Sequence, residues 1–136
     1  MQISNKMHKG FIIIASFLGA LAVALGAFGA HGLKKYATPA MINTFETAVK
    51  YQFYHVFALS ITGILYAYFP SNLLVTSGKL FIVGMSIFSG SLYLLTICSV
   101  LGLNQFKWLG AITPIGGLLL IVAWILMGLS LLRYKA

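Results

Sequence analysis

The stretch FIIIASFLGALAVALGAFGA, residues 11–30, decides the fold of this chain. It runs for twenty residues without a charged side chain, and about that many are needed for an α-helix to cross roughly 30 Å of hydrocarbon. Backbone amides find no water partner inside a bilayer, so such a segment satisfies them by folding as a helix. The stretch therefore predicts a transmembrane helix.

Three further stretches have the same character: residues 51–69, 80–103 and 108–132. None of them contains Asp, Glu, Lys or Arg. Short links between such segments make neighbouring helices antiparallel. The sequence therefore predicts an all-α membrane protein, in which residues 1–136 form a single membrane domain and four transmembrane helices form an up-down bundle.

Composition points to lipid as the partner of this chain. Of its 136 residues, 60% are hydrophobic and 7% are charged, whereas soluble domains carry about a quarter charged residues. The net charge of +8 comes from nine Lys and Arg residues against Glu46 alone. These cations lie singly or in pairs at the borders of the apolar stretches, which suits anionic lipid headgroups. They form no basic patch with interleaved aromatic residues, which argues against nucleic acid as a partner.

The link between the first two stretches contains a second helix signal. Thr38 suits an N-cap, and Pro39 suits the first helical position. Residues 39–50 then have helical spacing, with Met41, Phe45 and Ala48 on one face. We expect a short interfacial helix at about 39–50, which bends or runs directly into the second span.

The first stretch also resembles a secretory signal, because Lys6 and Lys9 precede its apolar run. The run is longer than the apolar core of a typical signal, so we expect a retained helix. If the amino terminus is inside, five cations lie on the inner side and four on the outer side. This small bias favours both termini in the cytoplasm. A dual-topology protein stays an alternative.

Small residues supply the means for helix packing. Helices in lipid associate through close contact, which small side chains permit. The first stretch carries a stripe made of Ser16, Ala20, Ala24 and Ala27. We expect packing within the chain, but contacts in a homo-oligomer or with a larger membrane-protein partner would use the same residues.

Eight polar residues are candidates for one pocket, because an up-down bundle places them in the same half of the membrane. An ionisable residue inside a membrane is a functional hypothesis by default. Structural hydrogen bonds between helices are nevertheless the more frequent role of such side chains. The eight are His31, Glu46, Tyr51, Gln52, His55, Ser89, Ser91 and Thr113.

No residues form a recognisable catalytic, cofactor-binding or metal-binding set. Cys98 is the single cysteine, so it can form neither an intramolecular disulfide nor a thiol relay. A metal site needs three or four ligands at suitable spacing, and His31, Glu46 and His55 show no such motif. Glu46 lies too near the border of a span to serve a proton-coupled exporter. We therefore expect a protein that is not an enzyme and has no cofactor.

Four segments in order along the chain carry a resemblance: GAFGAHGL (26–33), YQFYH (51–55), FSGSLY (88–93) and TPIGG (113–117). Through them the chain resembles the YwdK/YgdD-like family of small bacterial inner-membrane proteins, a domain of unknown function with eukaryotic small transmembrane relatives. The resemblance covers nearly the whole chain from about Met7. It implies a multi-pass protein of the bacterial cytoplasmic (inner) membrane with about four spans, and it supplies no catalytic residue.

These observations favour a non-enzymatic structural or accessory component of the cytoplasmic membrane. One alternative is a small oligomeric transporter or channel-like unit with a polar pocket around His31 and His55. A weaker alternative is a binder of a lipid, a quinone or haem.

Overall fold

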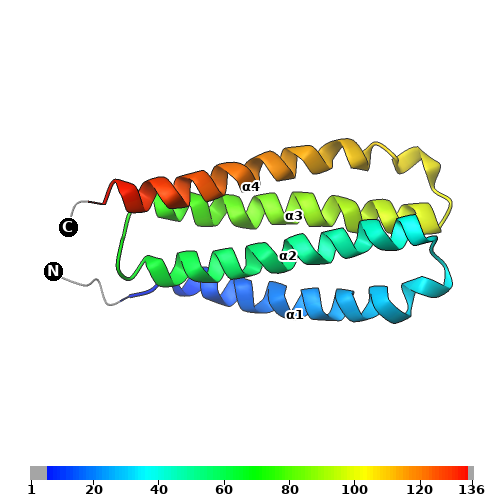
Figure 1. The fold of residues 1–136 in the computed structure, drawn as a ribbon, viewed down its shortest axis with the longest axis horizontal. Helices are drawn as coiled ribbons and strands as arrows, with labels where there is room; N and C mark the ends of the chain where they lie inside the picture. The colour runs from blue at the N-terminus through cyan, green and yellow to red at the C-terminus, as the bar shows by residue number, and fades with distance from the viewer. Residues whose placement is uncertain (1–5, 135–136) are drawn as a thin grey trace.

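The computed structural model describes residues 6–134, and within them every regular element is helical. Consecutive long helices lie side by side and run in opposite directions, so α1 begins and α4 ends at the same end of the molecule (Figure 1). This confirms the prediction of an all-α fold. The elements are α1 (Lys9–His31), η1 (Leu33–Lys35), α2 (Pro39–Leu65), α3 (Asn72–Val100), η2 (Asn104–Phe106) and α4 (Leu109–Leu132), the two η elements being single 3₁₀ turns.

Side-chain caps start the first three long helices. The Thr38 hydroxyl accepts a hydrogen bond from the Met41 amide, as the Thr38–Pro39 pair predicts, and Ser71 does the same for Leu74. His8 caps α1 through its ring nitrogen. Each cap satisfies an amide that has no partner within its helix.

The expected interfacial helix at 39–50 is not a separate element, because it is the first part of an uninterrupted α2. No glycine or proline interrupts the chain between Pro39 and Gly63. Phe45 and Ala48 are buried, and the Phe45 ring lies directly over Gly29 of α1. Packing against α1 therefore keeps this segment in line with the rest of α2.

The helix α3 starts well before the expected span at 80–103. In the sequence, Lys79 lies directly before the charge-free stretch at 80–103, but in the structure it lies within α3, on an exposed face. At its other end, α3 stops at Val100, where Gly102 adopts a φ of 72°. The Leu103 amide then bonds the Cys98 carbonyl at 2.8 Å, which closes the helix.

Three helical segments are long and apolar enough to cross a membrane: Lys9–Lys35, Asn72–Val100 and Asn104–Leu132. The helix α2 is equally long but more polar, because Gln52, His55 and other polar residues lie along it. Length and composition thus identify α1, α3 and α4 as candidate spans.

The core lies where the four helices pack together, toward the end of the bundle at which α1 begins and α4 ends. It includes Phe11 and Ala15 from α1, Leu59 from α2, Phe81 from α3 and Ala123 from α4. The small residues of α1 divide between two faces. Ala15, Ala22 and Gly29 are buried, whereas the stripe of Ser16, Ala20, Ala24 and Ala27 is exposed, so the expectation that this stripe packs within the chain is wrong.

Candidate functional site

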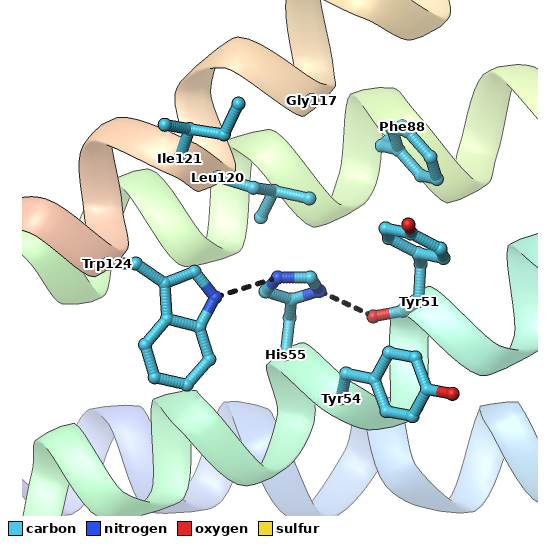
Figure 2. A pocket seen from close by; sticks show the side chains of 8 residues that line it. All are labelled: Tyr51, Tyr54, His55, Phe88, Gly117, Leu120, Ile121 and Trp124. Carbon is cyan, nitrogen blue, oxygen red and sulfur yellow. Dashed lines mark hydrogen bonds between the residues drawn. The ribbon is translucent and has the colours of Figure 1, made fainter.

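His55 is buried in α2 with 5% of its surface exposed, and both its ring nitrogens are paired (Figure 2). Its Nδ1 lies 2.6 Å from the Tyr51 carbonyl oxygen, and its Nε2 lies 3.2 Å from Nε1 of Trp124. A carbonyl oxygen only accepts and an indole N–H only donates. The geometry therefore defines the neutral tautomer, in which Nδ1–H donates to Tyr51 and Nε2 accepts from Trp124.

Gln52 is buried on the neighbouring face of α2 and joins three helices. Its Nε2 donates to the Leu18 carbonyl of α1 at 2.7 Å, and its Oε1 accepts from the Tyr93 hydroxyl of α3 at 2.7 Å. The amide thus uses a donor and its acceptor at the same time. This arrangement links α1 to α2 and α3.

The candidate serines and Thr113 also bond between helices. Ser89 donates to the Ala48 carbonyl at 2.8 Å, which ties α3 to α2. Ser91 and Thr113 join α3 to α4 through hydroxyls 2.7 Å apart. Because the Ser91 hydroxyl donates its one proton to the Phe88 carbonyl, Thr113 is the donor in that pair.

The structure does not bring the eight candidates together in one pocket. Tyr51 and His55 lie on the side of α2 that faces α4, whereas Gln52 and Ser89 line a smaller cavity of about 210 Å³ between α1 and α3. Ser91 and Thr113 lie between α3 and α4. His31 and Glu46 are exposed on the surface, at the end of α1 and in the first part of α2.

A cavity of about 520 Å³ lies between α2 and α4, over α3, and we call it the aromatic groove (Figure 2). Rings from three helices line it. The Tyr51 and Phe88 rings stack with centroids 4.5 Å apart, and the Trp124 ring meets His55 edge-on. Its lining residues are Tyr51, Tyr54, His55, Phe88, Gly117, Leu120, Ile121 and Trp124.

Comparison with known proteins places this helical chain in a family. The family model described as "Protein of unknown function (DUF423)" matches residues 25–117. A UPF0382 membrane protein of Staphylococcus haemolyticus is 40% identical over 126 residues, which cover 93% of this chain and 98% of that protein. The chain belongs to the DUF423 family.

Further relatives agree with this assignment. The UPF0382 membrane protein YwdK of Bacillus subtilis is 37% identical over 127 residues, covering 93% of this chain and 98% of YwdK. The resemblance to YwdK-like proteins is therefore confirmed, and this DUF423 chain is similar over most of its length to membrane proteins without an assigned activity. No solved structure matches it significantly.

Several residues that the structure places at these sites carry little signal in the sequence alone. Trp124 was one residue within a long apolar stretch, but an indole N–H in lipid needs an acceptor, and that need could have pointed to His55. Tyr93 follows Ser89 by one helical turn, so it shares the face that meets α2. Phe88 and Gly117 carry no polar signal, and only the assembled fold shows that they line the groove.

Metal ligands do not gather in the part of the chain that the structure describes. Residues 6–134 hold no group of three or more His, Cys, Asp or Glu side chains that could hold a metal ion. Cys98 is a half-buried free cysteine in α3.

Proposed function

We propose that this DUF423 protein crosses the bacterial cytoplasmic membrane four times, with both termini in the cytoplasm. The arrangement of the helices supports α2 as the fourth span. Since α1 and α3 run in the same direction, α2 must return from the far end of α1 to the start of α3 (Figure 1). If α1 and α3 cross the bilayer, α2 crosses it as well.

The length and bonding of α2 suit this role. Its 27 residues extend about 40 Å at 1.5 Å per residue. Two of the side chains that lower its hydropathy are bonded to other helices: Gln52 to Leu18 and Tyr93, and His55 to Trp124. Polar groups paired inside a bundle are tolerated at membrane depth, since lipid would leave them without partners.

Labelling of single cysteines tests this topology. Tyr36 lies in the link between α1 and α2, and Gln105 lies in the link between α3 and α4. In a Cys98→Ala background, Tyr36→Cys and Gln105→Cys should therefore react with a membrane-impermeant thiol reagent in intact cells. Pro70 lies in the link between α2 and α3, so Pro70→Cys should react only after the cells are opened. Reaction of Tyr36→Cys and Pro70→Cys from the same side would show that α2 does not cross the membrane. Labelling of Pro70→Cys alone in intact cells would show that both termini lie outside the cytoplasm.

Within that membrane, the protein acts as a non-enzymatic structural or accessory component. The observation that carries this proposal is the complete pairing of its interior. Among residues 6–134, no buried side-chain nitrogen or oxygen lacks a hydrogen-bond partner. The bonds of Gln52, Ser77 and Ser89 each run from one helix to another.

Such bonds brace a bundle and do not serve transport. A permeating solute needs polar groups that can exchange one partner for another, and here each exchange would release a contact between helices. Interhelical hydrogen bonds in membrane proteins contribute about 0.6 kcal/mol each on average. Several of them together hold the helices in one arrangement, which suits a scaffold for other membrane components.

The double variant Ser77→Ala and Ser89→Ala tests this function. It should lower the unfolding temperature in detergent, while sealed vesicles that contain it should pass protons and small ions no faster than vesicles with the wild-type protein or with none. Ser86→Ala is the matched control, because its exposed hydroxyl bonds only the Ile82 carbonyl of its own helix. A flux that the wild type carries and the folded double variant loses would contradict the proposal.

A further inference from the structure

We propose that the aromatic groove binds a lipid-soluble molecule with a flat ring that bears carbonyl oxygens, the chemical class of the quinones. The groove lies between α2 and α4 at the mid-length of α3, where Phe88 forms part of its wall (Figure 2). Its volume of about 520 Å³ falls within the roughly 300–1,000 Å³ of small-molecule sites. A ligand dissolved in the bilayer would enter it from the side.

The walls of the groove suit a flat ring. Tyr51 and Phe88 stack at an interplanar angle of 28°. Behind His55, the buried Phe81 ring meets Trp124 edge-on with centroids 5.2 Å apart. Gly117 leaves room beside Phe88, because a Cβ added there would stand 3.6 Å from the Phe88 ring. Aromatic faces offset or edge-on to a ligand ring add favourable contacts beyond area alone.

Two phenol groups supply hydrogen-bond donors to the same space. Tyr51 and Tyr54 are 40% and 57% exposed, and the structure gives neither phenol oxygen a partner among residues 6–134. The other polar groups of the groove, His55 and Trp124, are already bonded to each other. A hydroxyl at membrane depth gains from an acceptor that lipid tails lack. Carbonyl oxygens on a ring provide that acceptor, whereas an acyl chain does not.

The same geometry disfavours the other lipid-soluble ligands. His55, the histidine that lines the groove, offers no free nitrogen to a haem iron, because both its ring nitrogens are engaged. A phospholipid headgroup needs a cation, and no Lys or Arg lines the groove. The ring with carbonyl acceptors is the class that fits both the aromatic walls and the two phenols.

Quenching of tryptophan fluorescence tests the proposal. Trp108 and Trp124 are the two tryptophans, so the full chain carrying Trp108→Phe reports on the groove alone. A short-chain 1,4-naphthoquinone added to this protein in nanodiscs should quench Trp124 saturably. Gly117→Ile fills the groove and should weaken binding at least about tenfold. Gly128→Ile places the same side chain in open space on the same helix and should leave binding unchanged.

The double variant Tyr51→Phe and Tyr54→Phe separates hydrogen bonding from ring contact. It should weaken naphthoquinone binding about tenfold, since each bond contributes a few-fold in affinity, and leave binding of methylnaphthalene unchanged. Thermal unfolding checks that each variant is folded. Quenching that does not saturate, or that Gly117→Ile leaves intact, would overturn the site. A fatty acid that displaces the naphthoquinone at equal concentration would assign the groove to acyl chains and overturn the ligand class.

Discussion

The contact between α3 and α4 differs sharply from the outer face of α1, although both are rich in small residues. A Cβ added at Gly116 would lie 2.5 Å from the Phe88 backbone nitrogen, so α3 and α4 approach there almost backbone to backbone. On α1, Ala20 and Ala24 belong to a stripe of small residues that is left exposed by the other helices within residues 6–134. Small residues permit close packing, but the position of the neighbouring helix decides which of them are used.

The difference extends to hydrogen bonds. α3 and α4 are joined by Ser77 to the Ala123 carbonyl and by Thr113 to Ser91. Gln52 ties α1 to the rest through the Leu18 carbonyl. The molecule thus consists of a closely packed pair, α3 and α4, and an outer helix, α1, that is held by fewer contacts. We expect substitutions to affect the two regions unequally.

Gly116→Ala should have the largest effect on stability. Its new methyl group meets backbone atoms of α3, so the two helices must separate, and overpacking of this kind costs about 2 kcal/mol. Gly26→Ala makes the same change on α1, where the nearest atom is a Val49 methyl at 3.5 Å. That control should be neutral or stabilise by up to about 1 kcal/mol, since alanine is the better helix former. Unfolding titrations in mixed micelles measure both, and equal effects would remove the distinction between the two regions.

The sequence predicted where the helices lie along the chain better than it predicted which face of each helix is buried. Charge-free stretches located the long helices, and Thr38 with Pro39 located the start of α2, because these signals are local. The predicted span at 80–103 begins too late because Lys79 marks its border in the sequence, and one charge on an exposed face does not end a helix. The stripe on α1 was assigned inward because periodicity defines a face but gives no information on which neighbour lies against it.

The candidate site was predicted only in part for a related reason. His55 and Gln52 stood out because polar groups in lipid need partners, and each does have partners in the structure. Their partners Trp124 and Tyr93 lie on other helices, at distances along the chain that no short motif spans. The aromatic groove exists only because α2 and α4 both pack on α3, and that arrangement is a property of the assembled fold.

Gln52→Leu should have an intermediate effect and should act mainly on α1. The change keeps the volume of the side chain but removes both interhelical bonds, so we expect a loss of about 1 kcal/mol. Tyr93→Phe removes one of the two bonds and should cost about half as much. Hydrogen exchange followed by residue would show faster exchange in α1 than in α4. Uniformly faster exchange along all four helices would mean that α1 is not held separately.

Ala24→Leu should have the smallest effect, and it tests whether the exposed stripe of α1 faces lipid. Leucine and alanine differ little in helix propensity, and a surface change away from contacts stays within about 0.5 kcal/mol. Ala22→Leu, two residues earlier on the buried face, is the matched control and should destabilise the protein clearly. If Ala24→Leu instead shifts the mass measured by native mass spectrometry from a larger assembly to the single chain, the stripe is covered by another helix in the membrane. In that case the outer face of α1 is closely packed too, and its partner lies outside the chain.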